Sequence, residues 1–101
     1  MIVLRPDELT IVLEIIKKHI PQERVAAFGS RANGKARKTS DLDLAVMTAK
    51  PLPTGVLTAK KDAFSESRLP FRVDILDWSV IGDEFKKTIE KDMAEIYKPK
   101  G

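Results

Sequence analysis

Residues 25–47 read VAAFGSRANGKARKTSDLDLAVM and place two short apolar segments on either side of a polar one. The apolar run 24–28 is followed by glycine and predicts a buried strand. Residues 31–40 are polar and basic and contain an Asn-Gly turn signal. Residues 41–47 predict a second strand, which begins acidic and becomes apolar. The segment therefore indicates two strands joined by a long polar connection.

Hydrophobic spacing and proline predict the elements on either side of this segment. Apolar residues recur at helical spacing over residues 7–20, and Pro21 closes that helix. The tail at residues 94–97 fits either an edge strand or an extension of the last helix. The remaining expected elements are a helix over about 54–68, a strand over 72–76 and a helix over roughly 80–91. This order predicts an α/β (α+β) fold with helices flanking a small sheet.

Composition limits the class of protein. The 101 residues suffice for one domain and are too few for two, so we expect a single domain over residues 1–101. Cysteine is absent, which excludes disulfides, a cysteine-based zinc site and a thiol nucleophile. No apolar run is long enough for a membrane span and no signal-peptide pattern opens the chain, so we expect a cytoplasmic protein. The net charge of +3 is too small to identify a polyanionic partner.

Asp41 and Asp43 stand two residues apart at the head of a predicted strand. Side chains at such spacing point to the same face, so the two carboxylates project together. Their repulsion is unfavourable unless a cation lies between them, and Mg²⁺ prefers such oxygen ligands together with substrate phosphates. The alternative is an acidic strand start at the surface, and for an isolated Asp-x-Asp that alternative is the more common one.

Asp74 lies inside the predicted strand 72–76, RVDIL. A carboxylate within a short apolar strand needs a charged partner, a metal or an exposed face. It would complete a three-carboxylate metal site with Asp41 and Asp43. A salt bridge, for instance to Arg72 or Arg68, is an equally good explanation of Asp74 taken alone.

Gly29 and Ser30 directly follow the first predicted strand. Glycine permits a tight turn with close backbone approach, and a helical turn beginning at Ser30 would present free N–H groups to a phosphate. An ordinary strand-to-helix turn capped by serine is the alternative. Ser30 can share a site with the aspartates only if the two strands run antiparallel and Asp74 comes from a strand beside the second one. A phosphate cradle beside three carboxylates would hold a magnesium–triphosphate complex.

These residues closely resemble the DNA polymerase β-like nucleotidyltransferase superfamily. The resemblance rests on Gly29-Ser30, ten intervening residues, Asp41-x-Asp43, and Asp74 in an apolar strand about thirty residues further on. Residues 25–47 are similar to the minimal nucleotidyltransferase (MNT) branch, which includes the antitoxins of HEPN/MNT toxin–antitoxin pairs. The resemblance implies a palm-like fold with a small mixed sheet and a Mg²⁺-dependent enzyme that uses ATP.

The resemblance also implies a role for each matching residue. Asp41 and Asp43 would bind the Mg²⁺ ions that hold the triphosphate, and Asp74 would complete the metal that activates the acceptor hydroxyl. Gly29 and Ser30 would cradle the β and γ phosphates, and Arg31 would add positive charge there. One departure is that family members often carry arginine where this chain has Asn33, and the basic residues that follow are Lys35, Arg37 and Lys38.

In the antitoxin branch the acceptor is a tyrosine hydroxyl of a HEPN ribonuclease toxin, which the attached AMP blocks. The resemblance therefore implies a protein adenylyltransferase that acts as an antitoxin in a hetero-oligomer, with no membrane and no direct nucleic-acid partner. The main alternative is a non-catalytic antitoxin that neutralises its HEPN partner by binding alone.

Two further alternatives remain at this stage. One is a nucleic-acid-binding module, although no recognised DNA- or RNA-binding signature is present. The other is nucleotidyl transfer to a small molecule, which usually needs more chain to shape an acceptor pocket. The larger aromatic residues are interpreted as core rather than as a nucleotide-stacking platform; they are Phe64, Phe71, Trp78 and Phe85.

Overall fold

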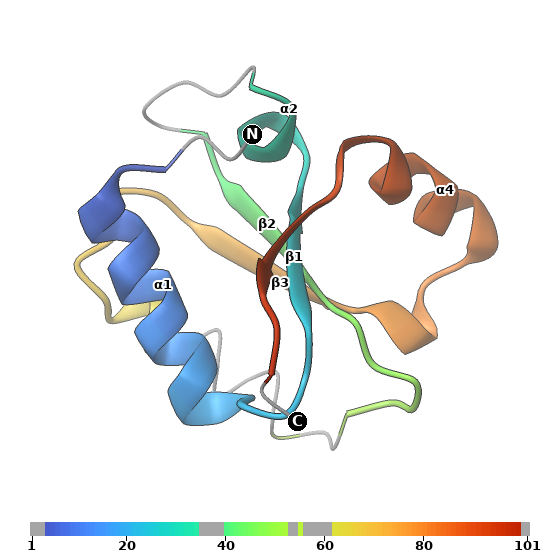
Figure 1. The fold of residues 1–101 in the computed structure, drawn as a ribbon, viewed down its shortest axis with the longest axis horizontal. Helices are drawn as coiled ribbons and strands as arrows, with labels where there is room; N and C mark the ends of the chain where they lie inside the picture. Colours follow the sequence, from blue (N-terminus) through green and yellow to red (C-terminus); the bar gives the residue numbers. More distant parts are fainter. Residues whose placement is uncertain (1–3, 35–39, 53–54, 56–61, 100–101) are drawn as a thin grey trace.

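The fold is seen in a computed structural model, which describes residues 4–34, 40–52, 55 and 62–99. Four strands form the centre of the molecule and helices flank them, as Figure 1 shows. The elements are α1 (Pro6–His19), β1 (Val25–Phe28), α2 (Ser30–Asn33), β2 (Leu42–Val46), β3 (Val73–Asp77), the 3₁₀ turn η1 (Trp78–Val80), α4 (Asp83–Asp92) and β4 (Ala94–Tyr97). No helix among the described residues is long and apolar enough to cross a membrane.

The sheet has the strand order β3-β2-β1-β4 and is mixed. β1 pairs antiparallel with both β2 and β4, whereas β2 and β3 run parallel. The expected antiparallel pairing of the first two strands is therefore confirmed, and the strand that carries Asp74 lies directly beside β2. Parallel neighbours need a crossover connection, and residues 47–72 supply it.

Residues 94–97, for which the sequence allowed either a strand or a helix, form the edge strand β4. Its position beside β1 is fixed at both ends by contacts with the segment that follows α1. Arg24 forms an ion pair of 2.6 Å with Glu95, and the Tyr97 hydroxyl donates a 2.8 Å hydrogen bond to the Pro21 carbonyl oxygen. Of the two interpretations of the tail, the edge strand is correct.

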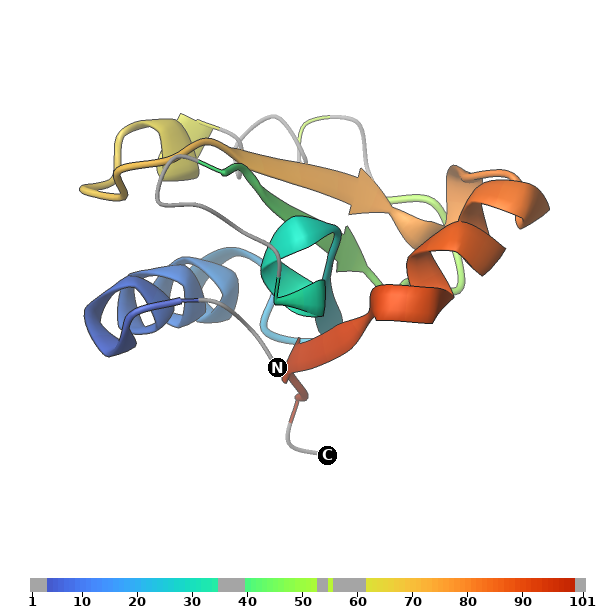
Figure 2. The same cartoon turned by 90° about the horizontal axis from the view of Figure 1, so that it is seen from above.

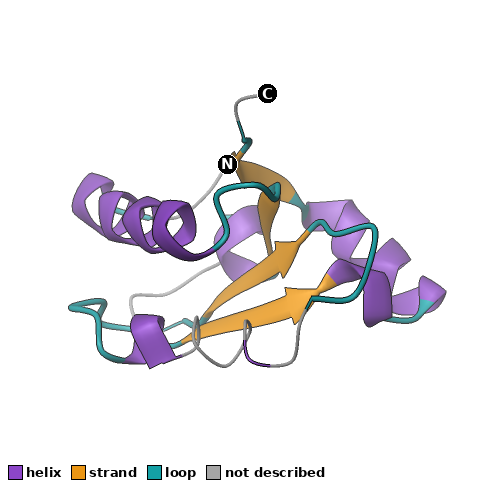
Figure 3. Cartoon of the chain, turned by 90° about the horizontal axis from the view of Figure 1, so that it is seen from below, coloured by secondary structure: helices purple, strands orange, loops and turns teal. Residues whose placement is uncertain are grey.

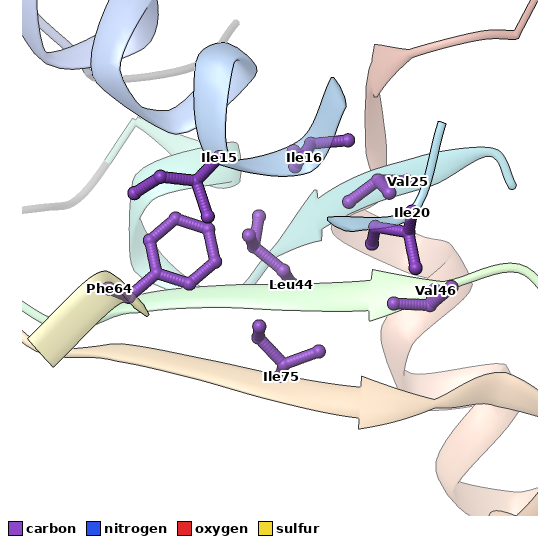
Figure 4. A pocket seen from close by; sticks show the side chains of 8 residues that line it. All are labelled: Ile15, Ile16, Ile20, Val25, Leu44, Val46, Phe64 and Ile75. Atoms are coloured by element: carbon purple, nitrogen blue, oxygen red, sulfur yellow. The ribbon is translucent and has the colours of Figure 1, made fainter. Parts of the chain in front are cut away.

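One face of the sheet carries the main hydrophobic core. Side chains alternate between the two faces of a strand, so Val25, Leu44 and Ile75 point to the same side. α1 covers this face with its buried residues, and Phe64, which lies within the crossover connection, packs against the same core. Figure 4 shows these apolar side chains pointing toward one another, and they leave no room for a water molecule between them.

The opposite face of the sheet carries a much smaller apolar layer. Its strand residues include Ala26 and Ala45, both buried, and α4 covers it with the buried Ile89. Figures 2 and 3 show α1 and α4 at opposite ends of the molecule with the strands between them. The prediction that Phe85 belongs to the core is wrong, because its side chain is 45% exposed. Phe85 contacts this face through an edge-to-face arrangement with the Phe28 ring, with 6.3 Å between the ring centres.

The predicted boundaries agree with the structure to within a few residues at most ends. The first helix begins at Pro6, where the Arg5 backbone N–H donates a 2.9 Å hydrogen bond to the Glu8 carboxylate. The third strand is shifted by one residue and ends at Asp77. Much of the helix expected over 54–68 lies outside the described residues, although Asp62 to Ser65 are helical.

Candidate active site

Asp43 and Asp74 are direct neighbours across two parallel strands. They occupy matching positions in the register of β2 and β3, so their side chains project from the same face of the sheet. Asp41 precedes β2 by one residue and adds its negative charge to the same place, since it contributes to the electrostatic environment of Asp43. The structure therefore places Asp43 beside Asp74, with Asp41 near enough for its charge to act on Asp43.

The pKa of Asp43 reports this crowding. Burial raises it above the ordinary value of 3.8, and the negative charges of Asp74 and Asp41 raise it further. All three effects disfavour the ionised form. The negative charge of ionised Asp43 is thus not balanced by a neighbouring positive charge among the described residues.

The described residues include no cationic partner for these carboxylates. The two ion pairs found there lie elsewhere on the surface. In particular, Asp74 forms no ion pair with Arg72 or Arg68, so neither of the salt bridges considered from the sequence accounts for its position. Its position is explained instead by exposure, because Asp74 lies on the open part of its sheet face.

Gly29 directly follows β1 and lies close to the Asp43 side chain. Its φ of +76° lies in the region that favours glycine, and a Cβ built on it would lie 2.7 Å from Asp43 Oδ2. A side chain at this position would be strained by the positive φ and would force the Asp43 carboxylate to move. The glycine-serine turn and the aspartates therefore form one site rather than two.

Ser30 is the first residue of the short helix α2, which Gly29 precedes as N-cap. α2 is a single turn that ends at Gly34, whose φ is +82° and whose N–H bonds to the Ser30 carbonyl oxygen. The turn is packed against β1 and β2, so Ser30 lies at the end of the sheet where Asp43 projects. The structure thus places the predicted phosphate cradle beside the carboxylates.

Arg31 is buried rather than open to solvent, with 3% of its surface exposed. Its Nε donates a 2.9 Å hydrogen bond to the Ser40 carbonyl oxygen, immediately before Asp41. Its guanidinium lies 3.9 Å from the centre of the Phe71 ring, just before β3. Arg31 therefore connects the three segments that carry the glycine turn and the aspartates. The basic residues Lys35, Arg37 and Lys38 lie outside the described residues.

The donor set fits Mg²⁺ by its chemistry. Carboxylate oxygens without a cationic partner are the ligands that this ion takes from proteins, alongside phosphate oxygens of a substrate. As the side chains stand, no three His, Cys, Asp or Glu residues in the described parts of the chain already form a metal-binding group. The charges of Asp74 and Asp41 disfavour ionised Asp43, and a divalent cation bound between these carboxylates would offset that repulsion.

An open pocket of about 330 Å³ lies at the outer edge of β3 and reaches Asp74. Its wall combines apolar residues such as Leu69 and Phe71 with the polar residues Ser65 and Arg72. The pocket lies on the far side of the carboxylates from Gly29, because β3 and β1 flank β2 on opposite sides. The site is thus flanked by a glycine turn at one end and a pocket at the other.

Sequence reasoning did not single out Asp77, at the opposite end of β3. It is buried to 4% exposure and accepts hydrogen bonds from the Thr48 hydroxyl at 2.5 Å, from the Leu52 N–H at 2.8 Å and from Ser79. Burial alone would raise its pKa, but these hydrogen bonds outweigh burial and hold the pKa below 3.8. A signal was present, since an aspartate at the end of a strand often accepts a hydrogen bond from the backbone N–H two residues on, here that of Ser79.

The fold and the site together define a nucleotidyltransferase domain: a mixed sheet with a glycine-serine turn beside aspartates on neighbouring strands. The model of the nucleotidyltransferase domain family matches residues 9–98, and the chain belongs to this family. Among curated proteins it is similar to the Haemophilus influenzae protein named "Probable protein adenylyltransferase MntA". The two are 47% identical over 88 residues, which cover 87% of this chain and 77% of the relative.

Solved structures share the fold. A toxin–antitoxin structure with AMP-PNP superposes with a TM-score of 0.74 at 20% identity, covering 88% of this chain and 72% of the other. A Shewanella oneidensis complex of a tri-AMPylated HEPN toxin with its MNT antitoxin contains a chain with a TM-score of 0.66 at 18% identity, covering 88% and 68%. At these identities the likeness is one of fold, and the expected palm-like architecture is confirmed.

Proposed function

We propose that this chain is a Mg²⁺-dependent protein adenylyltransferase, which moves AMP from ATP to a hydroxyl group of a partner protein. The observation that carries the proposal is the contact of Gly29 with Asp43 beside Asp74. A protein that only binds a partner has no use for three unneutralised carboxylates held next to a glycine turn. Family membership supports the same chemistry.

Each site residue has a role in this proposal. Gly29 and Ser30 bind the β and γ phosphates, and Asp41 and Asp43 hold the magnesium ions that accompany them. Asp74 orients the acceptor hydroxyl and accepts its proton as the oxygen attacks the α-phosphorus. Bound Mg²⁺ neutralises the triphosphate charge and lowers the pKa of the acceptor hydroxyl. The protein acts mainly by positioning, as in other phosphoryl transfers.

The geometry suits an in-line displacement. The attacking and leaving oxygens lie on opposite sides of the phosphorus, so pyrophosphate and acceptor must come from opposite sides of the carboxylates. Gly29 and the pocket beyond Asp74 occupy such opposite sides. Arg31, buried between α2, Ser40 and Phe71, would then keep the two sides in register rather than contact phosphate itself.

For the acceptor we propose a tyrosine of a HEPN-type toxin, bound in a hetero-oligomer in the cytoplasm. The support is the similarity to a relative named as a protein adenylyltransferase and to the structure of a tri-AMPylated HEPN toxin with its MNT antitoxin. In that role the chain is an antitoxin. The pocket beside Asp74, with apolar walls and a carboxylate at its rim, suits an aromatic side chain with a hydroxyl tip.

The experiment mixes the chain with its HEPN-type partner, α-labelled ATP and Mg²⁺, and follows label on the partner. We expect transfer by the wild type and by Glu14→Gln, a control that alters an exposed carboxylate on α1. Asp74→Asn should lower the transfer rate by about a hundredfold or more, because it removes a group that acts on the transferred proton.

The alternative, neutralisation by binding alone, predicts a different result in cells. If Asp74→Asn and Asp43→Asn bind the partner and protect cells as well as the wild type does, catalysis is not how the partner is neutralised. If no label reaches the partner from the wild type, the proposal is wrong.

A further inference from the structure

We infer that Phe28 and Phe85 form the platform on which the purine base of the nucleotide stacks. The inference rests on the function proposed above. The starting point is the position of Phe28, which is the direct partner of Asp43 in the antiparallel pairing of β1 with β2. Such partners point to the same face with their Cβ atoms about 5 Å apart. Phe28 therefore stands beside the carboxylates, one residue before Gly29.

Phe85 extends this aromatic surface outward. Its ring centre lies 6.3 Å from that of Phe28 with an angle of 88° between the rings, an edge-to-face contact. That contact leaves 45% of Phe85 exposed, although the residue is large and apolar. A second contact holds the same helix in place, because the Lys86 ammonium lies 5.5 Å from the centre of the Trp78 ring. The exposed Phe85 ring thus extends the aromatic surface that begins at Phe28, the strand partner of Asp43.

In the proposed reaction, the surface formed by Phe28 and Phe85 is the one that remains available to the base. Pyrophosphate must leave on the side of Gly29, and the acceptor must approach from the pocket beyond Asp74. The nucleoside is the remaining group on the α-phosphorus, and its base lies one ribose away from that atom. Phe28 is the strand partner of Asp43, and the Phe85 ring lies 6.3 Å from the Phe28 ring, so this aromatic pair is the apolar surface next to the carboxylates. Stacking on an aromatic ring accepts any base, so this contact supplies affinity more than base choice.

The test compares two probes on the isolated chain with Mg²⁺: AMP-PNP, which has a base, and inorganic tripolyphosphate, which has none. The variant is Phe85→Leu, which keeps an apolar side chain on α4 but removes the ring. We expect its affinity for AMP-PNP to fall about tenfold while its affinity for tripolyphosphate is unchanged. Val80→Ala is the control, because Val80 is also large, apolar and exposed, at 63%, but lies in η1.

Nuclear magnetic resonance gives a second readout that a purely structural role would not move. The adenine H2 and H8 resonances should shift upfield when AMP-PNP binds the wild type, through the ring current of Phe85, and much less with Phe85→Leu. Phe85→Tyr keeps an aromatic ring at this position and should therefore show the shift and the AMP-PNP affinity of the wild type.

Three results would overturn the inference. One is unchanged AMP-PNP binding by Phe85→Leu, and another is an equal loss for both probes. The third is weaker binding of the HEPN-type partner with normal AMP-PNP binding, which would make Phe85 a docking residue. Failure of the proposed function is separate, since it would appear as a wild type that binds AMP-PNP and transfers no label.

Discussion

Gly29 couples backbone conformation to the chemistry of the site. It is one of two described glycines with positive φ, and the other, Gly34, has no atom within 4 Å of its missing Cβ. The two positions therefore separate the cost of the conformation from the cost of the contact with Asp43. This separation makes a matched pair of variants informative.

Gly29→Ala should strongly reduce transfer, because its methyl group would lie 2.7 Å from Asp43 Oδ2 and push that carboxylate out of its position. Gly34→Ala should leave transfer nearly intact. Both variants should lose about 1–3 kcal/mol in free energy of unfolding from the strained φ alone. Transfer assays and chemical denaturation of both proteins check this expectation, and equal activity of the two variants would contradict it.

At the level of the elements, Asp77 joins the end of β3 to the segment after β2 and to η1. Its carboxylate satisfies two backbone N–H groups and two hydroxyls, all from within this region. An amide at this position could accept through only one oxygen. The Leu52 N–H, which bonds to Oδ2, would then face a donor or lose its partner.

Asp77→Asn should therefore lower the free energy of unfolding by about 1–3 kcal/mol. The pKa of Asp77 is lower in the folded protein than its ordinary value of 3.8, so its contribution is fully present above that pH. It is lost as the pH falls through the folded pKa, below 3.8. Denaturation curves at pH 7 and near pH 3 should show the gap between wild type and variant closing, and a constant gap would contradict this account.

For the molecule as a whole, the candidate site costs stability. The pKa of Asp43 is raised by burial and by its acidic neighbours, so its ionised form disfavours the folded state. Below pH 3.8 the Asp43 carboxyl is protonated in both the folded and the unfolded protein, so it does not lower the free energy of unfolding there. As the pH rises through the raised pKa of the folded state, ionisation of Asp43 lowers the free energy of unfolding of the wild type.

Asp43→Asn should therefore raise the free energy of unfolding at pH 7 by a few tenths to about 1 kcal/mol, while abolishing transfer. Wild type should be stabilised by Mg²⁺ with AMP-PNP, by about 1.4 kcal/mol at ten times the dissociation constant. The variant should show much less of that stabilisation. Thermal melts with and without the ligand measure both effects, with Glu14→Gln as the control, and a less stable Asp43→Asn would contradict the explanation.

The fold was largely predictable because its signals are local. Alternation put Asp41 and Asp43 on one face, and the polar connection required antiparallel strands. Phe85 could not be placed, since the spacing of Ile81, Phe85 and Ile89 reveals a helix face but not how little surface the sheet offers it. The burial of Arg31 was equally hidden, because Phe71 is distant in the chain and Ser40 lies at the far end of the polar connection.

The parallel pairing of β2 with β3 has a consequence for how the molecule is made. A ribosome releases the glycine turn and the first two aspartates long before the strand with Asp74, which follows the crossover at residues 47–72. Until then β2 has only β1 beside it, and a lone two-stranded hairpin is barely stable in water. A nascent chain that stops before β3 therefore lacks Asp74, and the three aspartates can share one site only after residues 73–77 have been made.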